Sequence, residues 1–248
     1  MKTRYDRKFY RDLDTTAEIS AREIVPLALD LTGARSVIDV GCGDGGWLSV
    51  FAAHGITDIL GLDGPWIDDD LLKIGRDKFQ RAELGAALPI DRRFDLAMSL
   101  EVAEHLPPEV AENFVSELTR LAPIVLFAAA IPGQGGLHHV NEQWPAYWAD
   151  LFVARGYVPI DAIRMRVWEN PKVTWWYKQN VLVYAARDAL ASYPRLAEAA
   201  SSAAPPALVH PDLFRNTLRA ARPRIGRWIK MAPAVVRRSL KSKRHVKS

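Results

Sequence analysis

Short apolar runs alternate with segments of helical periodicity along most of the chain. Asp14 to Glu18 has the composition of a helix start, and apolar residues then recur at helical spacing as far as Gly33. Apolar runs of strand length follow at 36–40, 58–62, 79–82, 94–100, 124–128, 157–167 and 180–185, with helical patterns at 47–54, 109–121 and 147–155. The pattern predicts a mixed α/β domain.

Strands that alternate with helices predict parallel βαβ units and an open sheet covered on both faces. The last two predicted strands differ, because Glu169–Lys172 between them is too short for a crossover helix. We therefore expect a hairpin there and an antiparallel final strand. The predicted fold is α/β, a Rossmann-like doubly wound sheet that is mostly parallel, with a basic C-terminal helical tail.

Charge is divided unevenly along the chain. The 33 Lys and Arg slightly outnumber the 29 Asp and Glu, but residues 213–248 hold twelve of the basic residues and none of the acidic ones. The first 212 residues therefore carry a net negative charge. Together with the linker-like Ser201–Pro206, this division predicts a domain at 1–190 and a linker and basic, partly helical or disordered tail at 191–248.

The tail combines basic residues with apolar ones such as Ile225, Trp228 and Ile229. A basic amphipathic segment is typical of binding to an anionic membrane surface, and a solvated tail without a partner is the alternative. We expect no nucleic-acid partner. No apolar run reaches the ~20 residues of a membrane helix, and the single cysteine, Cys42, excludes an internal disulfide. These features predict a cytoplasmic protein, peripheral at the inner membrane face.

The strongest local motif is a glycine-rich turn between a strand and a helix. Residues 37–46 read V-I-D-V-G-C-G-D-G-G, and glycines at such a turn let the backbone approach a ligand closely. Asp63 ends the next strand, where a carboxylate can accept the hydroxyls of a ribose. The motif predicts a nucleotide-type cofactor, with contacts from Asp39, Gly41, Cys42, Gly43, Gly45, Asp63 and Gly64.

With these motifs, residues 36–185 resemble the class I S-adenosylmethionine (SAM)-dependent methyltransferases. Asp39, Gly41 and Gly43 match the first motif of that family, and Asp63 matches the second. The resemblance implies the class I methyltransferase fold and SAM as the cofactor.

Two further motifs extend the resemblance. Residues 79–84 resemble the third motif, with Glu83 where most relatives have Asp, and residues 94–107 resemble the fourth. The resemblance adds Glu83, Leu84 and Leu100 to the expected cofactor site. A nicotinamide dehydrogenase is disfavoured, because the chain has no Tyr-x-x-x-Lys dyad.

Two segments carry candidate chemistry for the methyl transfer. Glu101, Glu104 and His105 follow one buried strand, and His138 and His139 lie in a glycine-rich loop after the next. Ligands of open α/β sheets sit beyond the carboxyl ends of the strands, so both segments should reach the acceptor. His139 or His138 is then a candidate general base for an acceptor hydroxyl, with Glu104 and His105 beside it.

The same groups fit two other interpretations. The pattern E-x-x-E-H resembles ubiquinone-pathway and small-RNA O-methyltransferases, which implies Mg²⁺ held by Glu101, Glu104, His105 and His139. Alternatively, Glu101 and Glu104 only place negative charge at the N-terminus of the helix that starts near Pro107.

The loop A-I-P-G-Q-G-G-x-x-H-V-N-E-Q-W-P resembles bacterial methyltransferases encoded beside cell-surface polysaccharide and secondary-metabolite genes. The resemblance implies a small-molecule or glycan acceptor and gives His139 the matching position. Aromatic residues at 144–148, 168 and 175–177 offer faces for a sugar ring, but Trp175 and Trp176 should alternate across a strand, with at most one in the pocket.

These observations predict methyl transfer from SAM to a hydroxyl of a small-molecule or sugar-containing acceptor. The alternative is a methyltransferase-like binding module without catalysis, associated with nucleic acid.

Overall fold

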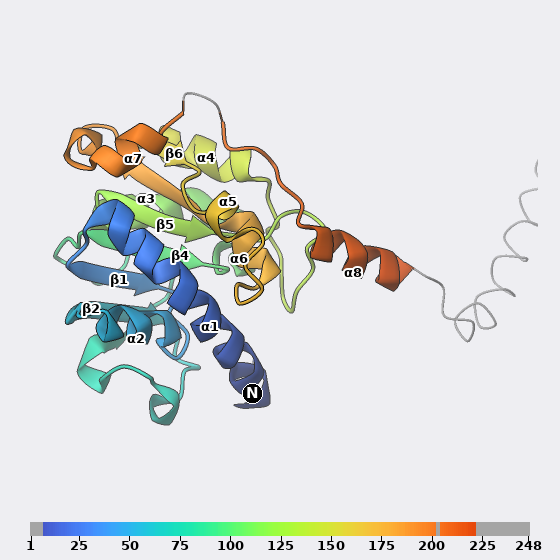
Figure 1. Ribbon diagram of the computed structural model, residues 1–248. Helices are drawn as coiled ribbons and strands as arrows, with labels where there is room; N and C mark the ends of the chain where they lie inside the picture. The colour runs from blue at the N-terminus through green and yellow to red at the C-terminus, as the bar shows by residue number, and fades with distance from the viewer. Residues whose placement is uncertain (1–6, 202–203, 222–248) are drawn as a thin grey trace, which may run out of the picture. The chain divides into compact units, whose positions relative to one another are not determined.

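The computed structural model describes residues 7–201 and 204–221. A seven-stranded sheet of order β3-β2-β1-β4-β5-β7-β6 runs through the domain (Figure 1). The strands are β1 (Ser36–Val40), β2 (Asp58–Asp63), β3 (Phe79–Arg81), β4 (Leu96–Leu100), β5 (Ile124–Ala128), β6 (Tyr157–Ile160) and β7 (Leu182–Ala186). The helices are α1 (Arg7–Thr32), α2 (Gly46–Ala53), α3 (Ala111–Leu121), α4 (Pro145–Val153), α5 (Arg164–Val167), α6 (Trp175–Asn180), α7 (Pro194–Ala199) and α8 (Pro211–Ala221).

Strand β1 lies at the point where the chain changes direction across the sheet. It pairs in parallel with β2 on one side and with β4 on the other. The chain runs outward from β1 to β3 and then returns to continue through β4 and β5. In doubly wound sheets a ligand binds at this switch point, beyond the carboxyl ends of the strands.

Strand β7 is antiparallel to both of its neighbours. Ile124 of β5 lies opposite Ala185, and Tyr157 of β6 lies opposite Ala186. The structure therefore confirms the predicted α/β fold, mostly parallel with an antiparallel final strand.

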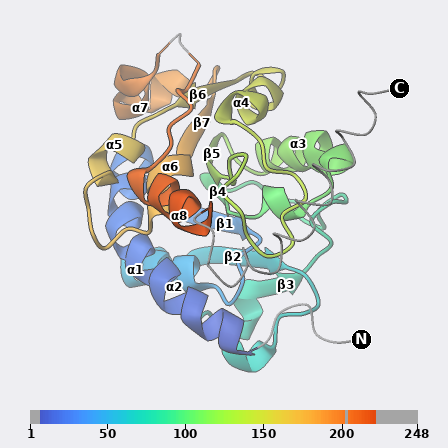
Figure 2. The same ribbon diagram turned by 90° about the vertical axis from the view of Figure 1, so that its right-hand side faces the viewer.

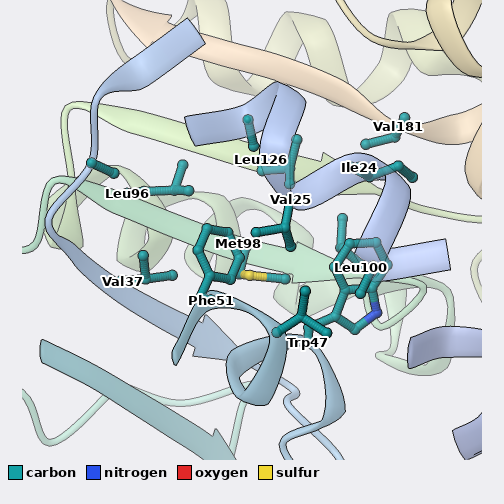
Figure 3. Close-up of a cluster of buried hydrophobic side chains, with 14 of the residues drawn as sticks. Ile24, Val25, Val37, Trp47, Phe51, Leu96, Met98, Leu100, Leu126 and Val181 are labelled. Carbon is teal, nitrogen blue, oxygen red and sulfur yellow. The ribbon is translucent and has the colours of Figure 1, made fainter. Parts of the chain in front are cut away.

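Helices cover both faces of the sheet, with α1, α2, α6 and α7 on one face and α3 and α4 on the other (Figure 2). On the first face, Ile24 and Val25 of α1 and Trp47 and Phe51 of α2 gather around Met98 of β4 (Figure 3). The central strands are apolar at nearly every position, because neither of their faces meets water. This packing fixes the strand ends that carry the site.

The first helix is longer than predicted. It begins at Arg7, so the expected start at Asp14 was wrong, and it ends before Gly33 as expected. An Asp-Thr-Thr pattern favours a cap only weakly, and a longer helix that packs on the domain overrides it.

The connection between β6 and β7 also differs from the prediction. It is not a four-residue hairpin turn, because the strand predicted at 157–167 ends at Ile160 and α5 and α6 follow. Ile163, Val167 and Val173 are buried in this segment although it adds no strand. The apolar residues there pack short helices against the domain. A short apolar run in the sequence does not by itself distinguish a helix from a strand.

The compact unit that contains the sheet ends at His210, later than the predicted domain boundary at 190. Leu196 of α7 is fully buried, and the Arg164 guanidinium donates to the carbonyl of Pro206 at 3.0 Å. The His210 amide donates to Gln179 Oε1 at 2.8 Å. Residues up to 210 therefore belong with the domain.

Helix α8 belongs to the second unit, from Pro211 onward. Phe214 and Leu218 are exposed on α8, and Arg215 pairs with Asp212 at 2.8 Å. The stripe of Ile225, Trp228 and Ile229 that suggested membrane binding lies outside the described residues. Within the described part of the chain, no helix is both long enough and apolar enough to span a membrane.

Candidate active site

A pocket of about 1090 Å³ opens beyond the carboxyl ends of β1, β2 and β4. Asp39, Asp63 and Leu100 line it from these three strands, while α6 and the loop after β5 line other parts of its wall. The pocket thus lies at the switch point of the sheet, where the sequence placed both the cofactor and the chemistry.

The glycine turn after β1 adopts a backbone that other residues rarely take. Gly41 has φ +91° and Gly43 has φ +57°. A Cβ at Gly41 would overlap the side chain of Val102, whereas a Cβ at Gly43 would meet nothing within 4 Å. Both glycines line the pocket, so a ligand can lie directly against the backbone of the turn.

The carboxylate of Asp63 ties this turn to the end of β2. Its Oδ2 accepts the Gly43 amide at 2.7 Å and its Oδ1 accepts the Gly64 amide at 2.6 Å. Burial raises the pKa of Asp63, and burial followed by the charge of Asp63 raises the pKa of Asp39 well above its ordinary value. A carboxylate has about four lone-pair sites, so Asp63 keeps acceptor capacity for a ligand.

Most of the predicted cofactor residues line the pocket, and two do not. Gly45 caps α2, where a Cβ would lie 2.8 Å from Ile74, and Gly64 lies under the ring of Trp66. Both make room for neighbouring side chains. Those that line the pocket are Asp39, Gly41, Cys42, Gly43, Asp63, Glu83, Leu84 and Leu100.

The sequence interpretation missed Trp66, which lines the pocket and is 41% exposed. The only sequence feature that could have identified Trp66 as a pocket residue is its position three residues after Asp63, the carboxylate that ends β2.

Glu101 directly follows β4 and has a strained backbone conformation, with φ 58°. Its Oε1 accepts from Asn180 Nδ2 and its Oε2 from Gln134 Nε2, both at 2.8 Å. Burial raises the pKa of Glu101 from 4.5 to about 7, although these two bonds oppose the shift. Strained residues persist where surrounding contacts hold them, as these two amides do here.

Glu104 is fully buried and lines the pocket. Its carboxyl group lies near the Glu101 carboxyl and the backbone of Ala130, although neither of its oxygens makes a hydrogen bond of good geometry with a described residue. Burial and then the charge of Glu101 raise its pKa well above the ordinary value. A buried carboxyl group without good hydrogen bonds is costly, which makes Glu104 a candidate for a functional role rather than a structural one.

The loop after β5 is fastened to the backbone of this segment. The amides of Val140 and Asn141 both donate to the carbonyl of Glu104, at 2.8 and 3.0 Å. This attachment brings His139 against His105, with ring centroids 4.8 Å apart in an edge-to-face arrangement. His138 precedes it with φ 62° and is exposed. The loop therefore places His139 among the acidic groups and His138 at the pocket surface.

His139 also contacts a carboxylate that the sequence interpretation did not single out. Its Nδ1 lies 2.9 Å from Glu142 Oε1. Only 12% of the His139 side chain is exposed. The sequence feature that could have identified Glu142 is its position three residues after His139 in the same loop motif.

Three of the four predicted metal ligands come together. Possible ligand atoms of Glu104, His105 and His139 lie within 4.8 Å of one another. Glu101 is not in this group and is hydrogen-bonded to Gln134 and Asn180 instead. The cluster offers a carboxylate and two imidazoles, a donor set that suits a divalent cation.

The aromatic wall differs from the prediction. Trp175 and Trp176 lie on helix α6, and both line the pocket with ring centroids 5.4 Å apart. The prediction that at most one would face the pocket was wrong, because it assumed a strand. Trp148 is buried against Phe127 in the core and does not line the pocket.

The lining of the pocket is acidic. Among the described residues that line it, none is Lys or Arg. Lys73 lies nearby, and its Nζ pairs with Asp44 at 3.0 Å and with Glu18 at 3.5 Å. The lining carboxylates are Asp39, Asp44, Asp63, Glu83, Glu101 and Glu104.

Solved structures of methyltransferases share this architecture. Human N-acetylserotonin methyltransferase in complex with SAM is 13% identical, with a TM-score of 0.52 over 71% of this chain and 54% of that chain. Magnesium protoporphyrin IX methyltransferase from Synechocystis PCC 6803 with bound SAH is 16% identical, with a TM-score of 0.51 over 71% and 87% of the two chains. At these identities the likeness establishes the fold alone.

A third structure, the SAM-bound amino pentose methyltransferase CalS10 from Micromonospora echinaspora, is 13% identical, with a TM-score of 0.50 over 67% of this chain and 89% of that chain. No curated protein sequence matches this chain. The profile of the methyltransferase domain family matches residues 7–166, which include the glycine turn, Asp63 and the cluster of His139. That match covers most of the chain and, with a sheet of the class I order, shows that this protein belongs to the methyltransferase domain family.

Proposed function

We propose that this protein binds SAM in the pocket and transfers its methyl group to a hydroxyl of a small, uncharged acceptor, with His139 as the general base. One observation carries the proposal: a single pocket joins the glycine turn and Asp63 to the cluster of Glu104, His105 and His139. Cofactor and acceptor can therefore meet inside it.

The residues of the turn fit SAM. Gly43 presents a bare backbone toward open space, and Asp63 is a buried acceptor at the position where a ribose would lie. Trp66 and Leu84 line the same pocket and can cover an adenine ring. The SAM- and SAH-bound relatives of the same fold support this assignment.

The chemistry requires few groups from the protein. SAM supplies a methyl group on a sulfonium, a reactive centre that needs no activation by the protein. The acceptor oxygen forms the new O–C bond while the C–S bond breaks and its electron pair stays on sulfur. His139 takes the hydroxyl proton, so that the oxygen attacks with developing negative charge. The pocket contributes orientation, which is the larger part of such catalysis.

The charge of the pocket limits the acceptor. No described lining residue is Lys or Arg, so a phosphate or carboxylate would lose its hydration in the pocket without gaining a cationic partner. Trp175 and Trp176 add aromatic faces on which a neutral ring can stack. We therefore expect a sugar or other hydroxylated ring without an anionic group at its reacting end. The same lack of basic residues in the lining disfavours nucleic acid in the pocket, because such binding depends on neutralised phosphates.

A divalent cation at Glu104, His105 and His139 is a second candidate for acceptor activation. The convergence of three ligand atoms, one of them from the buried carboxyl group of Glu104, favours it. The ion would lower the pKa of a bound hydroxyl directly. Loss of turnover in a chelator, restored by Mg²⁺ or another divalent ion, supports this candidate. Unchanged turnover in the chelator removes it.

SAM binding is tested at Asp63. We expect Asp63→Ala to weaken SAM binding by about 1.5–3 kcal/mol, the range for hydrogen bonds to a charged group. Isothermal titration calorimetry measures this change, with Asp70→Ala as a control at an exposed carboxylate outside the pocket. Absence of SAM binding by the unmodified protein would remove the proposal.

The acceptor class is tested by following SAH formation with matched compounds, such as glucose and glucose 6-phosphate or catechol and 3,4-dihydroxybenzoate. We expect turnover only of the uncharged member of a pair. A preference for the anionic member would contradict the charge argument. SAM binding without turnover of any acceptor would favour the binding module that lacks catalysis.

A further inference from the structure

We propose that Glu142 is a positioning residue that holds His139 in a single tautomer, with the proton on Nδ1 and the lone pair of Nε2 available to the acceptor. The inference rests on the proposed role of His139. It assigns a function to a carboxylate outside the pocket lining and beyond the motifs of the cofactor site.

The first observation is the contact between the two side chains. His139 Nδ1 and Glu142 Oε1 are 2.9 Å apart. A carboxylate accepts hydrogen bonds and donates none when it is ionised, so this bond requires a proton on Nδ1. In a neutral imidazole the other nitrogen, Nε2, is then the unprotonated one.

The second observation is that Glu142 is itself held in place. Its Oε2 accepts the amide of Gly133 at 2.7 Å, and its Oε1 accepts the amide of Gly135 at 2.8 Å. These amides come from the turn that opens the same loop, with φ +84° at Gly133 and +70° at Gly135. Both oxygens are therefore fixed, and the carboxylate cannot rotate without breaking bonds to the backbone.

The third observation concerns the packing of the His139 ring against Gly136. A Cβ at Gly136 would overlap the His139 ring, with Nε2 as its nearest atom. Gly136 lacks the positive φ of its neighbours, so its backbone conformation does not demand glycine. The missing side chain lets the backbone of Gly136 lie against the His139 ring, which seats the ring on the wall of the pocket.

These contacts explain how one loop prepares a base. Glu142 binds the turn and His139 together, the bonds from Val140 and Asn141 fasten the loop to Glu104, and glycine at position 136 leaves room for the His139 ring. A fixed tautomer directs the basic nitrogen toward the acceptor, whereas a mixture of tautomers would leave a fraction of the protein inactive. The same tautomer suits Nε2 as a ligand to a cation.

The test reads the tautomer directly and needs no acceptor. Long-range ¹H–¹⁵N spectra of the full-length protein, recorded where imidazoles are neutral, distinguish a protonated Nδ1 from a protonated Nε2. We expect His139 to be the Nδ1–H tautomer in the unmodified protein. In Glu142→Ala we expect loss of this single state and protonation at Nε2.

Gln143→Ala is the matched control, because this neighbour in the loop bonds to Asn141 and not to His139. We expect it to leave the tautomer unchanged. Glu142→Asp keeps a carboxylate and should retain a larger share of the Nδ1–H tautomer than Glu142→Ala. This comparison separates the loss of the carboxylate from a loosening of the loop. Turnover of Glu142→Ala should fall by roughly 10–100-fold, as for other residues that orient an imidazole.

An Nε2–H tautomer in the unmodified protein, or the same tautomer in Glu142→Ala, would overturn the proposal. Neither result depends on methyl transfer. The two claims can also fail separately. If the unmodified protein has the Nδ1–H tautomer but His139→Ala keeps full activity, His139 is not the general base, and Glu142 still orients the imidazole.

Discussion

His138 and His139 are adjacent in the sequence, yet the loop gives them different surroundings. His139 contacts His105 and Glu142 and is mostly covered, whereas His138 has a positive φ and is exposed. The difference arises from the bonds of Val140 and Asn141 to the Glu104 carbonyl, which fix the loop one residue after His139. Backbone attachment thus selects one of two equivalent side chains.

His139→Ala should lower turnover by roughly 10²–10⁴-fold, the usual contribution of a general base. SAM affinity should remain nearly unchanged, because the contacts proposed for SAM lie at the glycine turn and Asp63. Initial rates of SAH formation and calorimetric SAM binding measure the two effects. His138→Ala is the matched control, and an equal loss in that variant would contradict the assignment to His139.

At the scale of elements, the glycine turn and the start of helix α2 pack closely against neighbouring loops because their glycines have no side chains. Gly41 lies against Val102 from the segment after β4, and Gly45 lies against Ile74. Two loops that are distant in sequence therefore pack on the turn. Gly43 differs, since the space beside it is open.

Gly41→Ala and Gly43→Ala should separate folding from binding. A left-handed conformation costs a residue with a Cβ about 1–2 kcal/mol, and overlap with Val102 adds about 1–3 kcal/mol at position 41. We expect Gly41→Ala to lose more free energy of unfolding in urea denaturation. Gly43→Ala should instead lose more SAM affinity, and equal stabilities of the two variants would contradict this expectation.

Across the whole molecule, buried carboxylates make the domain sensitive to pH. The pKa of Glu101 is raised to about 7, and those of Glu104 and Asp39 are raised well above their ordinary values, in each case mainly by burial. The folded protein therefore keeps protons that the unfolded chain has already lost. Stability should fall as the pH rises.

For Glu101 this fall lies between pH 4.5 and about 7. Its slope is at most about 1.4 kcal/mol per pH unit, the value for one proton. Glu101→Gln should flatten part of the decline in the free energy of unfolding, measured by denaturation in a chelator so that no cation intervenes. Glu83→Gln, at an exposed carboxylate, should keep the slope. An unchanged slope in Glu101→Gln would exclude this carboxyl as its source.

The division of charge concerns the whole chain. The basic residues beyond 212 and the exposed Phe214 and Leu218 on α8 support a proposed contact with anionic lipid. A chain that ends at His210 should fold and bind SAM like the full chain, because the compact unit ends there. It should lose sedimentation with anionic vesicles, an attraction of about 1 kcal/mol per basic side chain that salt weakens. Equal vesicle binding by both chains would contradict this role.

The sequence alone determined the features that depend on neighbouring residues. The order of the seven strands and of helices α1 to α4 follows from local periodicity, whereas α5, α6 and α7 were not predicted. The turn after β1 follows from glycines at 41 and 43, because only glycine takes these backbone angles easily. Asp63 was also predictable, since its place is the end of the strand that follows the turn.

The tertiary structure decided what depends on residues distant in sequence. It gave His139 and His138 different surroundings, and it placed Trp175 and Trp176 together on a helix. It also brought Asn180 and Gln134 within hydrogen-bonding distance of Glu101. Finally, it placed Leu196 and Pro206 on the domain, through the burial of Leu196 and the bond from Arg164 to the Pro206 carbonyl. Hydrogen bonds and burial of this kind join segments that only packing brings together, and no local pattern specifies which donor will meet which acceptor.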